Sequence, residues 1–408
     1  MKKFFRSNST ALIATIALLV ATNTLKAQEE EKPKVMEIYG FIMMDAGYNF
    51  NQIHPDWFDV VRPTKLPSFK NEFGTDGNTY FSVRQTRLGF KNYFQTGLGE
   101  LKTHFEFEMF GTGVDAGQTT MRLRHAYAEL GKWGVGQYWS PFMDIDVFPN
   151  TVEYWGPTGM AFFRNVQIRY MPIQGDSRLT FALERPGASA DQGVYQNRIE
   201  LQNVRSRFNL PDLSAEFRYG KKWGYVEIAG ILRKIQWVDE AINPQYDLSD
   251  EVIGWGINLS TNLKIGDRTT FRGQFVYGEG IENYMNDATT DVGIKTNPGN
   301  PTKPIEGVAL PLTGIVAFID HNWNEKFSTS VGYSSIDIDN ANGSAPDAFA
   351  TGQYGIANLL YTPFKNFMCG VELQYGKREN FTDGFESDIF KTQLSFKYSF
   401  GHAFYANK

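Results

Sequence analysis

Hydrophobic and polar residues alternate with a period of two along most of this chain. Segments of roughly 10 residues carry apolar side chains at every second position. Successive side chains of a β-strand point to opposite faces, so this period predicts strands with one apolar and one polar face. We predict about sixteen strands, at 35–50, 79–93, 100–110, 119–130, 134–139, 162–171, 177–184, 206–219, 224–238, 252–265, 268–279, 313–323, 327–338, 352–362, 367–379 and 389–400.

The last predicted strand shows what the alternation implies. Leu394, Phe396 and Tyr398 share one face, whereas Gln393 and Ser395 share the other. We expect the apolar face to meet lipid and the polar face to meet an aqueous interior. A soluble sandwich would not repeat this pattern on nearly every strand.

The connections between the predicted strands are short and long in turn. The short ones have Gly, Pro, Asn or Asp at their corners. Short turns at one end and long loops at the other are typical of a bacterial transmembrane β-barrel. The fold class we predict is therefore all-β, an antiparallel barrel with long loops at 51–77, 140–161, 185–205, 239–251, 280–312 and 339–350.

The N-terminus has the layout of a secretory signal peptide. Lys2, Lys3 and Arg6 precede an apolar run at 11–21, and Ala27 has the small side chain that suits a cleavage site. The run is shorter than the roughly 20 residues of a membrane helix. We expect cleavage after Ala27 and export to the bacterial outer membrane, although an uncleaved anchor is the alternative.

The chain then divides into four parts. We expect a signal peptide at 1–27, a short acidic segment at 28–34, a barrel at 35–400 and a tail at 401–408. Outer-membrane barrels usually end on an aromatic residue, and the strand pattern favours Phe400 over Phe404 or Tyr405.

Composition narrows the function. Loss of residues 1–27 removes four basic residues and no acidic one, so the net charge falls from −5 to −9. We find no basic stripe for nucleic acid. The five histidines are scattered, and no motif for nucleophilic catalysis, phosphate binding or dinucleotide binding occurs. We expect no enzyme activity, cofactor or metal; Asp144 and Asp146 could in principle hold a cation, but a polar loop explains them better.

Two long stretches carry a family resemblance. They are RQTRLGFKNYFQTGLGELKTHFEFEMFG at 84–111 and MRLRHAYAELGKWGVGQYWSPFMDID at 121–146, continued by WGPTG at 155–159 and FALERP at 181–186. The chain resembles the DcaP-like porins over essentially its whole mature length. The resemblance implies a trimeric, sixteen-stranded outer-membrane pore, embedded in lipid, that passes small hydrophilic anions, including dicarboxylates.

The loop at 140–161 is the candidate constriction. It follows the fifth predicted strand, it is too long simply to join two strands, and its aromatic residues argue against disorder. We expect it to fold into the pore with Asp144, Asp146 and Glu153 facing arginines across the lumen. The alternative is that it lies over the mouth with its acids solvated.

Basic residues supply the opposite wall. Each one either pairs with a wall carboxylate, such as Glu106 or Glu108, or contacts solute. A charged ring of this kind can select ions, and we expect a mild anion preference. The candidate lining residues on the strands are Arg87, Lys91, Arg122, Arg124, Arg169, Arg218 and Arg233.

Other classes of protein remain open at this point. An outer-membrane barrel enzyme or a non-conducting structural or adhesin barrel would share the strand pattern. Conductance in planar bilayers separates a pore from both. A soluble carbohydrate-binding β protein is the third choice, and it would leave the membrane without detergent.

Overall fold

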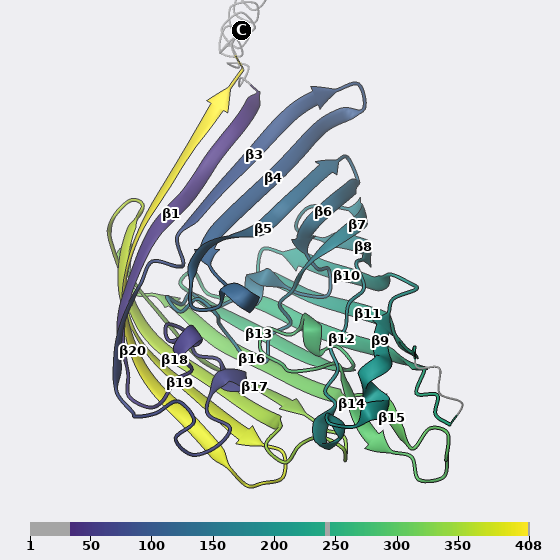
Figure 1. The fold of residues 1–408 in the computed structure, drawn as a ribbon. Coiled ribbons are helices and arrows are strands. Elements are labelled where there is room, and N and C mark those ends of the chain that lie inside the picture. The colour runs from purple at the N-terminus through teal and green to yellow at the C-terminus, as the bar shows by residue number, and fades with distance from the viewer. Residues whose placement is uncertain (1–32, 241–244, 407–408) are drawn as a thin grey trace, which may run out of the picture.

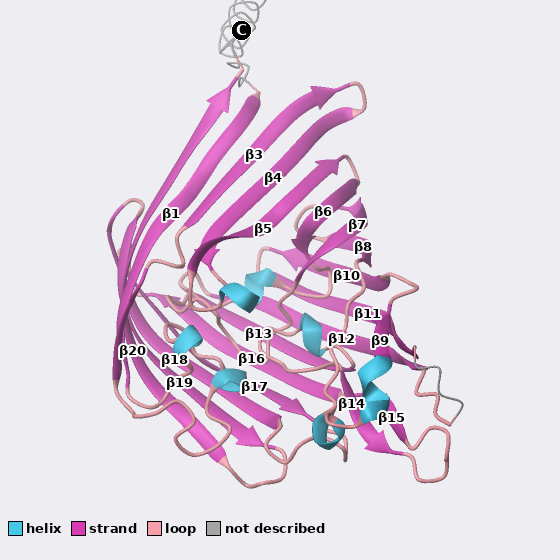
Figure 2. Cartoon of the chain, in the orientation of Figure 1, coloured by secondary structure: helices cyan, strands magenta, loops and turns pink. Residues whose placement is uncertain are grey.

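The chain folds into one closed antiparallel barrel of sixteen strands, as predicted (Figures 1 and 2). The computed structural model describes residues 33–240 and 245–406. Pairing of the last strand with the first closes the barrel. Around the wall the strands are β1 (Lys34–Asn49), β3 (Arg87–Thr96), β4 (Gly99–Phe110), β5 (Thr119–Leu130), β6 (Trp133–Trp139), β7 (Arg164–Ile173), β8 (Arg178–Glu184), β10 (Asp212–Lys221), β11 (Gly224–Asp239), β12 (Asp250–Ile265), β13 (Thr269–Glu279), β16 (Pro311–Asn322), β17 (Phe327–Ile338), β18 (Phe349–Phe364), β19 (Phe367–Asn380) and β20 (Glu386–Tyr405).

Two predicted strands are each interrupted. The strand predicted at 79–93 is β2 (Asn78–Ser82) followed by β3, because the chain leaves the ladder where Arg84 turns to bind Asp59. The strand predicted at 206–219 is β9 (Val204–Arg207) followed by β10. Between them Pro211, which has no backbone N–H, cannot donate to the ladder.

The faces of the strands follow the predicted alternation. Leu394, Phe396 and Tyr398 are 45, 39 and 50% exposed on the outer surface, whereas Gln393 and Ser395 are 1% and 0% exposed on the inner face. In hydrocarbon no water can satisfy backbone groups, so a spanning sheet must close on itself. The apolar outer band and the polar interior both follow from this closure.

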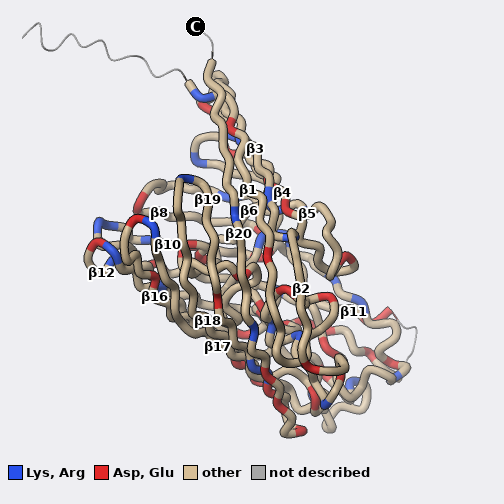
Figure 3. The backbone as a smooth tube through the Cα atoms, turned by 90° about the vertical axis from the view of Figure 1, so that its left-hand side faces the viewer, with Lys and Arg blue, Asp and Glu red and all other residues tan. Residues whose placement is uncertain are grey.

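The two ends of the barrel differ. Short turns, the start of β1 and the end of β20 lie at one end, which we call the turn end, and long connections lie at the other, the loop end (Figure 1). Several acidic positions lie in the loops at the loop end (Figure 3). In Figure 1, β1, β3, β4 and β20 rise beyond the other strands at the turn end.

The last strand is longer than we predicted. We expected it to end at Phe400, but it pairs with β1 as far as Lys34 and Tyr405, so most of the expected tail at 401–408 belongs to the barrel. Gly401 and Ala403 carry almost no side chain, which hid this continuation from the alternation pattern. The expected signal peptide at 1–27 lies outside the described residues, as does most of the segment at 28–34.

The loops contain structure of their own. The loop at 280–310 contains a hairpin that we did not predict, β14 (Val292–Thr296) and β15 (Ile305–Ala309). Short 3₁₀ helices are η1 (Pro55–Trp57), η2 (Pro63–Lys65), η3 (Gly113–Asp115), η4 (Ile145–Val147), η5 (Gly193–Tyr195), η6 (Ile199–Asn203) and η7 (Glu282–Tyr284). Among the described residues, no helix has the length and apolar character needed to cross a membrane.

A charge on the outer wall should be costly, and the same charge on the inner wall should not. Leu259 lies on the outer face of β12, and Asn262 lies on its inner face. We expect Leu259→Arg to lower the free energy of unfolding in lipid vesicles by about 2–4 kcal/mol, and Asn262→Arg to lower it much less. Equal losses for the two variants, measured by urea titration, would contradict the assignment of the faces.

Candidate pore and its constriction

The loop between β6 and β7, residues 140–163, lies inside the barrel, and we call it the constriction loop. Its first part is bound to the wall further around the barrel, beyond β8. The Asp144 carboxylate accepts hydrogen bonds from Arg218 Nη2, the Tyr225 hydroxyl and the Ser260 hydroxyl, each at 2.6 Å. Asn258 Nδ2 also donates to the Phe142 carbonyl at 2.7 Å. Strands β10, β11 and β12 therefore hold this part of the loop.

The middle of the constriction loop follows the inner wall further around. Asn358 Nδ2 on β18 donates to the Asn150 carbonyl at 2.8 Å. On β19, Glu372 accepts from the Val152 N–H at 3.1 Å and from the Thr151 hydroxyl. The Val152 carbonyl accepts from Gln393 on β20 at 3.0 Å. Polar side chains of successive strands thus satisfy the loop backbone.

The return part of the loop crosses the same wall. The Gly159 N–H donates to Ser334 Oγ on β17 at 2.9 Å, and the Ala161 N–H donates to Gln274 Oε1 on β13 at 2.9 Å. The loop therefore lines the wall from β10 to β20. The open part of the lumen is left between the loop and the wall formed by β20, β3, β5 and β7.

This open part holds a cavity of about 530 Å³, which we call the upper cavity. Five cationic side chains line it, and among the described residues the only acid in its lining is Glu153. The aromatic side chains of the constriction loop form its other side. The five cations are Arg87, Arg122, Arg124, Arg164 and Lys397.

Two glutamates of β4 neutralise part of this charge. Arg124 binds Glu106 and Glu108, each at 2.6 Å, and Arg87 lies 3.2 Å from Glu108. Arg122 also binds Glu108, and both contact the Tyr154 hydroxyl of the constriction loop. The arginines are therefore held in place by carboxylates behind them, with their guanidinium groups at the cavity.

Two of the five cations have no acidic partner within the part of the chain that the structure describes. Arg164 lies over the Trp139 ring, 5.1 Å from its centroid, and its Nη1 is buried without a hydrogen-bond partner. Lys397 lies 4.2 Å from the centroid of the Phe41 ring. We did not single out either residue from the sequence. Even with Glu106, Glu108 and Glu153 counted against the five cations, the cavity carries an excess of two positive charges.

A second lumen cavity of about 430 Å³ lies nearer the turn end. Its lining is electrically balanced, with Lys102, Arg169 and Arg178 set against Glu129, Asp146 and Glu216. Ile145 of the constriction loop lines both cavities. Ile145 therefore lies between the two cavities.

The structure distributes the ten candidate residues among different environments. The upper cavity is lined by Arg87, Arg122, Arg124 and Glu153. The second cavity, nearer the turn end, is lined by Arg169 and Asp146. Lys91 faces the interior beside the Tyr39 ring but lines neither cavity. Arg218 binds Asp144, Asp146 and Glu227, and so anchors the loop.

Three of our expectations for these residues were wrong. Asp144 does bind an arginine, Arg218, but neither Asp144 nor Glu153 stands free in the lumen, because they are 0% and 2% exposed. Glu153 instead accepts from the Val61 N–H at 3.1 Å and from the Tyr354 hydroxyl at 3.2 Å, which joins the constriction loop to the loop at 50–77. Arg233 is sealed beneath the loop at 280–310, where it binds Asp212 and Asp291.

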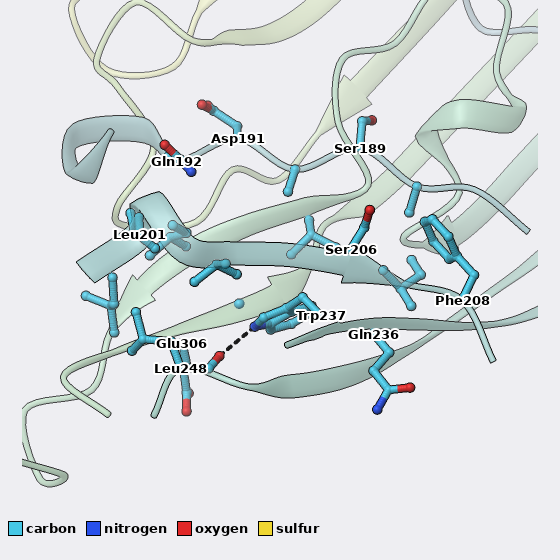
Figure 4. Close-up of a pocket in the computed structure, with 18 residues that line it drawn as sticks. Ser189, Asp191, Gln192, Leu201, Ser206, Phe208, Gln236, Trp237, Leu248 and Glu306 are labelled. Atoms are coloured by element: carbon cyan, nitrogen blue, oxygen red, sulfur yellow. Dashed lines mark hydrogen bonds between the residues drawn. The ribbon is translucent and has the colours of Figure 1, made fainter. Parts of the chain in front are cut away.

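A further cavity, of about 220 Å³, lies outside the lumen among the loops (Figure 4). Its lining is largely apolar and includes Leu201, Leu248 and Ile305. The Trp237 indole N–H donates to the Leu248 carbonyl at 2.8 Å. Among the described residues no lysine or arginine lines it, so it does not share the cationic character of the upper cavity.

Removal of the Asp144 carboxylate should widen the pore. Asp144→Ala leaves Arg218, Tyr225 and Ser260 without their shared acceptor, and loss of one member of a buried charge pair costs about 3–5 kcal/mol. We expect higher single-channel conductance and more current noise in planar bilayers. Asp267→Ala is the control, because Asp267 is exposed in the turn between β12 and β13 and lines neither lumen cavity. Unchanged conductance in correctly folded Asp144→Ala would show that this anchor does not set the pore size.

Comparison with known proteins agrees with this geometry. A family model described as DcaP outer membrane protein matches residues 15–400. No curated protein sequence matches the chain. The crystal structure of the outer membrane channel DcaP of Acinetobacter baumannii is 21% identical, with a TM-score of 0.73, and the match covers 90% of this chain and 97% of that one.

Two more distant structures share the fold. The anion-selective porin from Comamonas acidovorans is 10% identical, with a TM-score of 0.58 over 90% of this chain and all of that one. A trimer form of OmpT, an outer membrane protein of Vibrio cholerae, is 12% identical, with a TM-score of 0.52 over 90% and 99%. The closed barrel, the constriction loop within its lumen and the match over residues 15–400 lead to one conclusion: this chain belongs to the DcaP outer membrane protein family and is a porin of the bacterial outer membrane.

Proposed function

We propose that this porin passes small hydrophilic solutes with a mild preference for anions, dicarboxylates among them. The observation that carries this proposal is the unbalanced charge of the upper cavity. Arg164 and Lys397 have no acidic partner among the described residues, whereas the other three cations share Glu106 and Glu108. A permeating anion is attracted by the unpaired charges, and a cation is repelled.

The position of these charges explains why they outweigh the net charge of the chain. Charges in water act over roughly 8 Å at physiological salt. The acids of the distant loops therefore contribute little at the cavity. Inside a narrow lumen with low-dielectric walls, nearby charges act much more strongly.

The cavity also suits transport better than catalysis. Arg87, Arg122 and Arg124 are held by carboxylates behind them and line the open lumen, an arrangement that favours the passage of anions along this wall. We propose that the chain is a channel and not an enzyme. A barrel hydrolase or a non-conducting adhesin would show no stable open-channel current in a planar bilayer.

We propose a homotrimer in outer-membrane lipid as the functional assembly. One structure that shares this fold is a trimer form. Ring-shaped homo-oligomers are a common way for one surface to bury another on an identical copy. The mass of the purified protein in detergent, measured by light scattering, tests the assembly separately from conductance.

Neutralising the unpaired cations should reduce the anion preference. Under a potassium chloride gradient we expect Arg164→Gln and Lys397→Gln each to move the reversal potential toward the cation side, and the double variant to move it further. Lys132→Gln is the control, because Lys132 is exposed in the turn between β5 and β6. Cation preference in the unmodified protein, or equal shifts in Lys132→Gln, would overturn the proposal.

The solute class can be tested with the same preparation. Because two positive charges are left over at the upper cavity, a small dicarboxylate such as succinate should interrupt chloride current more than acetate or glucose does. This interruption should weaken in Arg164→Gln. Equal effects of succinate and glucose would leave no support for a dicarboxylate preference.

A further inference from the structure

A hollow of about 640 Å³ lies on the outer face of the barrel, across the neighbouring strands β8, β10, β11 and β12 (Figure 1). Ala215 on β10 pairs with Gly230 on β11 at its floor, where neither residue brings a large side chain. The side chains around this floor are apolar and exposed. They include Phe181, Leu183, Leu213, Leu232 and Ile257. The hollow is therefore a groove within the apolar outer band.

The wall leaves this space unfilled although a side chain would fit there. A Cβ atom added at Gly230 meets the Gly256 carbonyl oxygen at 3.7 Å, which is an ordinary van der Waals contact, and no other atom within 4 Å. In a membrane, an apolar hollow on the outer face is filled by acyl chains or by another protein. The charges beside the hollow distinguish these two occupants.

On two strands the apolar lining gives way to a cation at the next outward position toward the loop end. On β8, Arg185 comes two residues after Leu183, and its N–H continues the ladder by donating to the Val166 carbonyl at 2.8 Å. On β11, Lys234 comes two residues after Leu232. Because residues two apart share a face of a strand, both cations lie on the outer face just beyond the hollow.

β9 adds two arginines beyond Lys234. Arg207 and Arg205 pair with Gln236 and Val238 of β11, which are the next two positions on the face that carries Lys234. Both arginines are exposed. Four cations therefore follow one another along the outer rim of the barrel. We call Arg185, Arg205, Arg207 and Lys234 the outer cation cluster.

Little negative charge opposes this cluster. Arg207 Nε donates to the Asn209 side-chain oxygen at 3.1 Å, and Arg205 donates to backbone carbonyls of its own loop. Lys234 pairs with Glu251 at 2.7 Å, and an exposed pair of this kind is weak. Within the described chain, the three arginines have no acidic partner, so their charge is available to an anion.

The outer rim of the opposite wall carries the other sign of charge. Asp337 on β17 and Asp388 on β20 are exposed at outward positions near the loop end. Lys377 on β19 is paired with both Glu379 and Glu386. The outer cation cluster is therefore a local feature of β8, β9 and β11 and not a general property of the rim.

A phosphorylated lipid of the outer leaflet fits the hollow and the cluster together. Long loops of a bacterial barrel face the outside of the cell, so the cluster lies at the level of the outer headgroups. The apolar hollow favours an acyl chain, and guanidinium groups hold phosphate with paired hydrogen bonds. Free phosphate would use the cluster alone, and an apolar protein surface would use the hollow alone.

We propose that this outer face binds lipopolysaccharide through its lipid A, with an acyl chain in the hollow and a phosphate at the outer cation cluster. Lipopolysaccharide forms the outer leaflet of a bacterial outer membrane, and lipid A combines phosphates with several acyl chains. The site lies outside the lumen. It is therefore independent of the solute that the pore passes.

Native mass spectrometry of the delipidated protein in detergent, titrated with lipid A, tests this proposal. We expect the double variant Arg185→Gln, Arg207→Gln to weaken binding by about tenfold or more, because two charge-assisted bonds are lost. Gly230→Leu, which fills the hollow, should weaken binding as well. The matched controls, which should bind as the unmodified protein does, are Arg268→Gln in the exposed turn between β12 and β13 and Gly355→Leu at an outward position of β18, where an added Cβ meets one carbonyl oxygen at 3.5 Å.

Two further probes separate lipid A from other sources of the same chemistry. Lipid A without its phosphates and phosphatidylglycerol should each bind more weakly than lipid A, and equal binding of either would overturn the proposal. Displacement of lipid A by inorganic phosphate alone would also overturn it, because the hollow would then contribute nothing. Equal losses in the controls would show that the effect is not local to this face.

Single-channel conductance of the same variants separates this site from the pore. We expect it to be unchanged, because none of the substituted residues lines a lumen cavity. A variant that no longer conducts has lost its fold, and the other half of the site, hollow or cluster, then decides the result. Failure of lipid A to bind the unmodified protein would overturn this inference and leave the channel function intact.

Discussion

The structure depends on one constraint, that every backbone N–H and C=O group at membrane depth needs a partner within protein. Sixteen strands meet this constraint by closing β20 onto β1 along the whole length of β1. Closure separates two environments that the same strands serve at once. Lipid receives the apolar face, and the opposite face must be filled by polar groups, water or further chain.

The constriction loop is possible because of that polar inner face. A loop of this size has its own backbone groups to satisfy, and Asn258, Glu372, Gln393 and Ser334 satisfy them from different strands. By occupying the wall from β10 to β20, the loop leaves the open lumen beside the wall that carries Arg87, Arg122 and Arg124. The position of the pore and its electrostatic character are therefore consequences of where the loop is bound.

The departure of the same loop from the wall limits the pairing between β5 and β6. Its departure after Trp139 removes the strand that would otherwise continue beside Thr119–His125. The chain that fills the lumen is therefore missing from the wall, and part of β5 has no partner on its β6 side among the described residues.

The sequence by itself determined the barrel, the faces of its strands and the identity of the constriction loop, because period-two alternation and loop length are local properties that survive without knowledge of contacts. It left open whether each arginine pairs with a wall carboxylate, such as Glu106 or Glu108, or contacts solute. Only the tertiary structure decided which charges are free. Asp144 and Glu153 are buried by partners more than 50 residues away, and Arg233 is sealed by a distant loop. Arg164 has the alternation of a lipid-facing residue, yet it lines the cavity because the wall opens beside it. Alternation assigns a side chain to a face of a continuous sheet, and it fails where the sheet is interrupted.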